Sequence, residues 1–345
     1  MRIGRQQLSV LLNRLYDRGD ERFTIAHPSE AVGDLVSIEL GEPDSSTVRF
    51  TKRRDAYANA RDDVRRTHGD RVAGDLPKPD EYVKAAMAAG IVPVENVEEI
   101  RAFLDRYGDP DLMAGHRPVF AGFDTNLLAW RIDRVLGLRD PDGGVGYVNG
   151  FVLASGVRDE LDWDVKCDDT DPYVDAWGPA FEAYWTQPTG SGRISRLGLL
   201  GYRGIRDVEH ADEIQCERGD AAIVEAYDAW ESDARGEIML FSNDRTFVER
   251  AHGHTILAQH VEVPRDLPRK ETATWRELET LLYTLTILFG VLSLPGVTLR
   301  GVWRGKDELD WQRERLRLDP RSTTLEPQLE CDLAIVDAYE ALPTE

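Results

Sequence analysis

Two short apolar runs, residues 119–123 and 238–241, constrain the fold more than any other feature of the chain. Neither run alternates apolar with polar residues, as a strand with one solvated face would. Unbroken apolar runs of this length are typical of parallel strands that helices cover on both faces. We therefore expect both runs to be buried, neighbouring strands of an α/β fold.

Four acids occupy comparable places after strands or at helix starts. Asp124 follows the first apolar run and Asp244 the second. Glu160 follows a third apolar run, in the expected first turn of a helix, and Asp220 is expected to open a helix after a glycine. Because the carboxyl ends of parallel strands meet at one edge of a sheet, these side chains are expected to converge. Clustered carboxylates would repel unless a cation offset their charge, and oxygen ligands suit Mg²⁺ or Mn²⁺.

In this order the motifs resemble those of the PIN-domain nucleases, a metal-dependent family distantly similar to flap endonucleases. The matching segments are Asp124-Thr125-Asn126, residues 157–161, Gly219-Asp220 with Ile223, and Ser242-Asn243-Asp244. The resemblance covers roughly residues 117–264, under half the chain. The chain departs from a compact family member in its long stretch between Glu160 and Asp220 and in its two large flanks.

The resemblance implies a metal-dependent endonuclease acting on RNA. Asp124 and Asp244 would hold one Mg²⁺ or Mn²⁺, while Glu160 and Asp220 would complete its shell through water or help to position a second ion. The ion would lower the pKa of a water that attacks the phosphodiester. Hydrogen bonds to these ligands, or contacts with substrate phosphate, are expected from Thr125, Asn126, Ser242 and Asn243.

Two other functions stay open at this point. One is a PIN-like fold that serves as a binding or scaffolding module with weak or no catalysis. The other is a structure-specific DNA nuclease, although the chain has no helical-clamp motif that would favour it. Binding of Mn²⁺ would separate an enzyme from a scaffold.

Three consecutive domains are expected. An N-terminal α/β or α+β domain covers residues 1–115, a PIN-like parallel sheet with helices on both faces covers 116–264, and a C-terminal α+β extension covers 271–345. The uncharged tract 281–294 is shorter than the about 20 residues of a membrane-spanning helix, so we expect a buried helix there. Residues 331–336 are expected to form a final strand.

The composition bounds the partners and the compartment. Among 345 residues, 63 are acidic and 42 are lysine or arginine, for a formal net charge of −21. This balance disfavours general coating of nucleic acid and fits a halophilic protein in a high-salt cytoplasm, or an ordinary acidic one. Three isolated cysteines and an N-terminus without an apolar signal core also favour the cytoplasm and no membrane. The oligomeric state stays open.

Two basic clusters stand out against the acidic background. The first consists of Arg49, Lys52, Arg53 and Arg54 and continues along an expected helix to residue 66. The second consists of Arg300, Arg304, Lys306, Arg313, Arg315 and Arg317, interleaved with Trp303 and Trp311. Such clusters would hold phosphates while an indole stacks on a base. Acids are interspersed in both, so a solvated face with internal ion pairs is the alternative.

Overall fold

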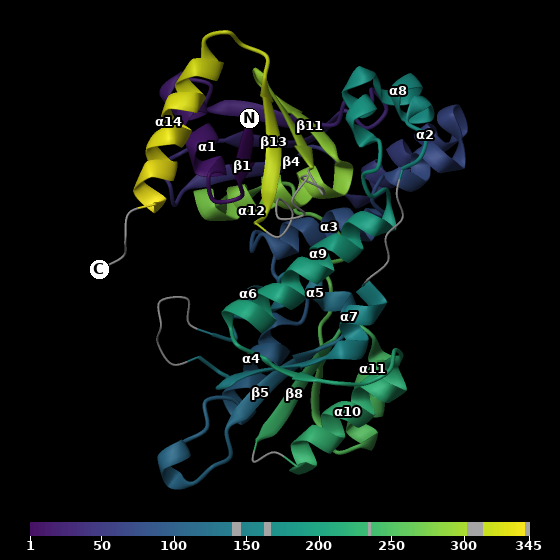
Figure 1. Cartoon of the computed structure of the whole chain (residues 1–345), viewed down its shortest axis with the longest axis vertical. Coiled ribbons are helices and arrows are strands. Elements are labelled where there is room, and N and C mark those ends of the chain that lie inside the picture. The colour runs from purple at the N-terminus through teal and green to yellow at the C-terminus, as the bar shows by residue number, and fades with distance from the viewer. Residues whose placement is uncertain (140–145, 162–166, 234–235, 302–312, 342–345) are drawn as a thin grey trace. The chain divides into compact units, whose positions relative to one another are not determined.

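The protein forms two compact units, each assembled from separate stretches of the chain (Figure 1). The computed structural model describes residues 1–139, 146–161, 167–233, 236–301 and 313–341. The first unit comprises Met1–Val92, Val165–Arg193 and Arg265–Glu345; the second comprises Pro93–Asp164 and Ile194–Pro264. This division differs from the three consecutive domains expected from the sequence, because both flanks contribute strands to a single sheet.

That sheet has eight strands in the order β1-β13-β12-β11-β2-β3-β4-β10, and every neighbouring pair is antiparallel. The strands are β1 (Arg2–Gly4), β2 (Arg22–Ala26), β3 (Asp34–Glu39), β4 (Ser46–Phe50), β10 (Glu271–Ala273), β11 (Val291–Leu294), β12 (Val297–Gly301) and β13 (Arg315–Pro320). Buried and accessible residues alternate along most of them, since successive side chains point to opposite faces. One face therefore belongs to the core and the other is polar.

Within the described residues, the helices of the first unit are α1 (Leu8–Asp17), α2 (Arg54–Asp75), α3 (Pro79–Ala88), α8 (Asp171–Trp177), η2 (Pro179–Tyr184), α12 (Trp275–Phe289) and α14 (Leu325–Glu340). Helix α12 begins with a capping box, in which Thr274 and Glu277 each accept a hydrogen bond from the other's backbone N–H. Every residue from 278 to 289 is buried, so α12 forms the middle of this core.

The tract 281–294, expected as one buried helix, is a helix followed by a strand. Helix α12 ends at Phe289 because Gly290 adopts a positive φ of 74°, and residues 291–294 form β11. A Cβ at Gly290 would lie only 1.2 Å from the Tyr184 hydroxyl oxygen, so no other residue fits this close approach. The expectation of burial is confirmed, and the expectation of a continuous helix is wrong.

Residues 331–336, expected as a strand, lie in helix α14. Leu325, Leu329 and Leu333 recur every four residues and are buried, a spacing that places them on one face of a helix. The α14 helix lies beside α1, where Arg14 forms an ion pair with Asp332 (Figure 1). The last strand of the sheet is β13 instead, within the charged stretch that precedes α14.

The second unit contains a five-stranded sheet in the order β7-β6-β5-β8-β9, with every neighbouring pair parallel. Its strands are β5 (Val119–Phe123), β6 (Gly150–Ala154), β7 (Asp212–Ile214), β8 (Glu237–Ser242) and β9 (Leu257–His260). Figure 1 shows β5 and β8 side by side. Their register runs from Val119 opposite Glu237 to Phe123 opposite Phe241. The expected α/β class and the parallel pairing of these strands are confirmed, although Phe120 is only half-buried.

The helices of this unit are α4 (Val97–Tyr107), η1 (Leu112–Ala114), α5 (Thr125–Leu128), α6 (Ile132–Val135), α7 (Ser155–Leu161), α9 (Ser191–Arg203), η3 (Gly204–Val208), α10 (Asp220–Asp233) and α11 (Arg245–Gly253); α9 begins in the first unit. The α4 helix was expected in the N-terminal domain. The Asn96 side chain ties its start to the end of the parallel sheet, donating to the His260 carbonyl (2.8 Å) and accepting from the Glu262 N–H (2.9 Å). No helix in the described part of the chain is long and apolar enough to cross a membrane.

A buried ion pair joins three remote stretches of the first unit. Arg193 and Asp75 are each 1% exposed, and Arg193 Nη2 donates to Asp75 Oδ1 over 2.7 Å. The same guanidinium donates to the carbonyls of Leu288 (2.9 Å) and Pro188 (3.1 Å). Asp75 ends α2, and Leu288 lies near the end of α12. The Arg193 side chain therefore holds both helix ends and the segment around Pro188.

We predict that Arg193→Met destabilises the protein by about 3–5 kcal/mol, because it leaves the Asp75 charge unpaired in the interior. Equilibrium urea unfolding followed by circular dichroism measures the change. Arg65→Met is the matched control, since the Arg65–Asp62 pair is 43% and 59% exposed and contributes at most about 1 kcal/mol. Equal effects of the two substitutions would contradict the stabilising role of the buried Arg193–Asp75 pair.

Glu279 gives the first unit a pH-dependent stability. It lies on α12, is 8% exposed, and burial raises its pKa to about 7 against the opposing charges of Arg5 and Arg276. The folded state thus disfavours the ionised form, so the stability that Glu279 contributes is complete below about pH 4.5 and is lost as the pH rises through 7. We predict that Glu279→Gln is about 2 kcal/mol more stable than the parent at pH 8, and that this gain shrinks towards pH 5. Urea unfolding at both pH values measures it, and a gain independent of pH would refute it.

Candidate functional site

Asp124 lies at the carboxyl end of β5 and is 3% exposed. Its backbone N–H donates to the Phe241 carbonyl (3.1 Å), which extends the pairing with β8 by one residue. Its Oδ2 atom accepts hydrogen bonds from Ser242 Oγ (2.6 Å) and Asn126 Nδ2 (3.2 Å). The carboxylate is therefore held in place by Ser242 of the neighbouring strand β8 and by Asn126, two residues after Asp124 in the chain.

Ser242 connects Asp124 to Asp244. Its Oγ donates to Asp124 and accepts from the Asp244 backbone N–H (2.9 Å). Asp244 Oδ1 in turn accepts from the Thr246 N–H (2.8 Å) and caps the N-terminus of α11. The acids that follow β5 and β8 thus share one hydroxyl.

Glu160 lies in the last turn of α7, and its expected place in the first turn is wrong. The reason is that α7 begins at Ser155, directly after β6, without an intervening turn. Glu160 Oε2 accepts from Thr125 Oγ1, and Oε1 accepts from the Gly219 N–H (2.9 Å). Because Thr125 follows Asp124 and Gly219 precedes Asp220, this carboxylate bridges the two segments that carry those acids.

Asp220 begins α10, as the sequence predicts, and acts on Asp124 through its charge. Burial raises the pKa of Asp124, and the negative charge of Asp220 raises it further. Hydrogen bonds from Ser242, Asn126 and the Thr125 backbone oppose this shift by stabilising the charged form. Ionised Asp124 is therefore less favourable in the folded chain than in water.

The four acids lie where the parallel sheet changes direction. The chain runs from β5 outward through β6 to β7 and then returns to β8 on the other side of β5. Open α/β sheets bind their ligands outside the carboxyl ends of the strands at such a point. The donors are carboxylate oxygens, which suit Mg²⁺ or Mn²⁺. Among the described residues, no three His, Cys, Asp or Glu side chains are grouped closely enough to hold a metal ion together.

Asn243, expected to contact the ligands or the substrate, contributes its backbone carbonyl to a contact with His260 Nε2 at 3.2 Å. Of the residues expected to contact nucleic acid, those of the first cluster, Arg49, Lys52, Arg53 and Arg54, belong to the first unit. Arg53 forms an ion pair with Asp266, and Arg54 one with Asp80. Arg49 and Lys52 have no ion pair within the described residues, while Arg304 and Lys306 lie outside that part of the chain.

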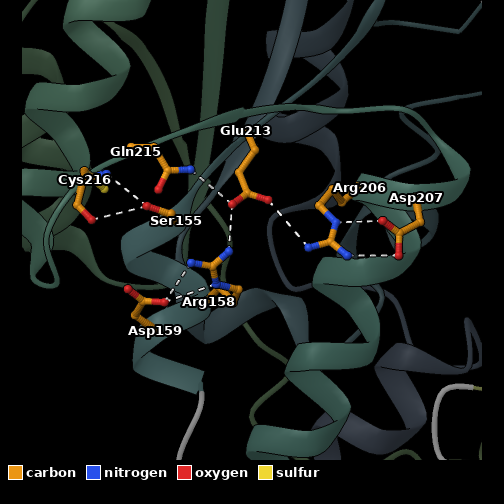
Figure 2. A network of polar contacts seen from close by, with 8 residues as sticks. All are labelled: Ser155, Arg158, Asp159, Arg206, Asp207, Glu213, Gln215 and Cys216. Atoms are coloured by element: carbon orange, nitrogen blue, oxygen red, sulfur yellow. Dashed lines mark hydrogen bonds and ion pairs between the residues drawn. The ribbon is translucent and has the colours of Figure 1, made fainter. Parts of the chain in front are cut away.

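A polar network that the sequence did not indicate supports the helix carrying Glu160 (Figure 2). Arg158 on α7 donates to Glu213 on β7 over 2.8 Å, and Arg206 lies 3.6 Å from the other oxygen of Glu213. At the start of α7, Ser155 Oγ accepts from the Cys216 N–H (3.0 Å). The network joins α7 to the edge strand. In the sequence, Arg158 stands beside Asp159 and Arg206 beside Asp207, so both read as local surface pairs.

Searches with this chain found no matching family model and no matching curated protein.

We predict that Asp124→Asn stabilises the protein at pH 7. The raised pKa of Asp124 means that its contribution to stability is complete below 3.8 and is lost as the pH rises through the folded-state value. An amide keeps the shape and removes the buried charge, so the gain should shrink as the pH is lowered towards 4. Thermal unfolding at several pH values measures this gain. Glu225→Gln, an exposed acid on α10, is the control and should change little; a destabilised Asp124→Asn protein at pH 7 would refute the prediction.

Proposed function

We propose that this protein is a metal-dependent endonuclease that hydrolyses phosphodiester bonds in RNA. The observation that carries the proposal is the linkage of four acids, Asp124, Glu160, Asp220 and Asp244, at the carboxyl edge of the parallel sheet. That edge, at the change of direction between β5 and β8, is where such sheets bind ligands. The resemblance to PIN-domain nucleases supports the choice of RNA.

Asp124 and Asp244 would hold a Mg²⁺ or Mn²⁺ ion, and Glu160 and Asp220 would complete its surroundings or position a second one. When bound, such an ion supplies a reactive water near neutral pH and offsets negative charge on the phosphate. A cation also fits the electrostatics, because burial and Asp220 both disfavour the charge of Asp124 when no cation is near.

The residues of the chain orient the reactants. Hydrolysis forms a bond between phosphorus and the water oxygen, breaks the bond to the leaving ribose oxygen, and gives that oxygen a proton. Ser242 fixes Asp124 and the backbone of Asp244, while Thr125 and Gly219 fix Glu160. Such preformed hydrogen bonds reduce the reorganisation that the reaction requires.

A specific observation favours the second candidate, a PIN-like binding module without catalysis. Both oxygens of Glu160 accept hydrogen bonds from protein donors, and one oxygen of Asp244 caps α11. Carboxylates satisfied in this way also occur as purely structural groups. Calorimetric titration with Mn²⁺ separates the candidates: binding that Asp124→Asn abolishes supports the nuclease, and no binding by the parent supports the module.

We predict that Asp124→Asn lowers the rate of RNA cleavage at least about 100-fold, because it removes a full negative charge from the metal ligands. End-labelled single-stranded RNA is incubated with Mn²⁺ at several salt concentrations, and the products are separated on gels. Single-stranded and flap-containing DNA run in parallel decide between RNA and DNA. The control Glu225→Gln should cleave like the parent. Equal cleavage by Asp124→Asn and the parent would show that Asp124 is not a metal ligand of the nuclease.

A further inference from the structure

The polar face of the eight-stranded sheet carries a row of arginines. Arg2 lies directly opposite Arg317, and Arg317 lies directly opposite Arg300 on its other side. Directly opposite residues of neighbouring strands project from the same face of a sheet. Side chains from β1, β13 and β12 therefore form one positively charged row, although Arg2 is remote from the other two in sequence.

The same face extends across the sheet to β4. Arg300 lies opposite Val291, and Ser293, two residues further along the same strand, lies opposite Ala26. Thr24, two residues before Ala26, lies opposite Ser37, which in turn lies opposite Arg49. Residues two apart on a strand project from the same face. Arg49 and Arg317, which belong to separate basic clusters in the sequence, thus share one face. The distance from β13 to β4 is five strand spacings, or about 24 Å.

This face is more positive than the molecule as a whole. It is exposed at Arg2, Arg317, Arg22 and Arg49 and less accessible in between, where Val291 is buried. Arg317 is 55% exposed and Arg22 is 80% exposed, and Arg2 and Arg49 are also exposed. Arg300 is held more firmly, since its Nε donates to Asp319 (2.6 Å) and its Nη1 to the Ala180 carbonyl. On the described strands the face carries six arginines, Arg2, Arg22, Arg49, Arg300, Arg315 and Arg317, and three acids, Asp34, Glu39 and Asp319. The whole chain, by contrast, has a net charge of −21.

We propose that this face binds the sugar–phosphate backbone of single-stranded RNA. Arginine forks match phosphate oxygens, and the hydroxyls between them, on Thr24, Ser37, Ser293 and Thr298, can donate to phosphate or accept from a ribose 2′-hydroxyl. The described strands place no aromatic side chain on this face, so bases would not stack there and binding would be independent of sequence. An acidic protein fits less well, because the face lacks the large apolar anchors of protein interfaces.

The inference takes RNA as the partner from the proposed function but concerns a surface separate from the four acids, so binding is measured without cleavage. Fluorescence anisotropy of a labelled single-stranded RNA of about 20 nucleotides, long enough for one binding face, is recorded in EDTA. The test variant is Arg49→Gln with Arg317→Gln. Arg49 has no hydrogen bond or ion pair among the described residues. When Arg317 is replaced, Asp319 still has its ion pair with Arg300, so the fold should persist. Circular dichroism checks this.

The matched control is Arg65→Gln with Arg66→Gln, which removes the same charge from the exposed surface of α2. We expect the sheet variant to bind about tenfold more weakly at 0.1 M salt and the control to bind like the parent. The slope of log K against log salt should fall in magnitude by about 1.4 in the sheet variant, or about 0.7 for each lost phosphate contact.

Three outcomes would overturn the inference: equal weakening in both variants, unchanged binding in the sheet variant, or displacement of the RNA by polyglutamate at a matched charge concentration. The last would identify a site for acidic protein. A parent that binds RNA through the sheet face but does not cleave it with Mn²⁺ supports the inference and refutes the nuclease. A parent that cleaves while the sheet variant binds normally refutes the inference alone.

Discussion

The first unit depends on the buried pairing of Arg193 with Asp75. A charge in the interior is tolerated only when a partner and hydrogen bonds replace its water. Those partners come from the end of α2, from the segment around Pro188, and from Leu288 near the end of α12. The native pairing thus exists only when all three stretches are assembled. Burial together with the Arg193 charge also lowers the pKa of His27 to about 3, so that this histidine stays neutral in the core.

The second unit places its chemistry differently, on short polar links around the ends of parallel strands. Ser242 holds the acids after β5 and β8, and Glu160 joins the segments of Thr125 and Gly219. Helix α7, which carries Glu160, is fixed to the edge strand by Arg158 and Glu213 (Figure 2). The proposed catalytic acids belong to this unit, and the proposed RNA-binding face belongs to the other.

Local pattern was a reliable guide wherever one periodicity dominated. The apolar runs at β5 and β8 are parallel neighbours and are buried except for Phe120, and α10 begins at Asp220 as predicted. The pattern failed where two structures suit the same residues. Residues 331–336 are apolar enough for a strand, but leucines spaced by four make them helical, and Gly290 divides a continuous apolar tract at a contact with Tyr184.

The sequence by itself determined the α/β class, the buried strands and the places of Asp124, Asp220 and Asp244 at strand ends and a helix start, because these follow from side-chain period and turn chemistry. Only the tertiary structure decided that both flanks share one sheet, that Arg49 and Arg317 lie on one face, and that Glu160 is held from two segments. Strand pairing joins Arg2 to Arg317, and the buried ion pair joins Asp75 to Arg193, so both connect residues more than a hundred positions apart. Their free energy depends on partners that no local window of sequence contains.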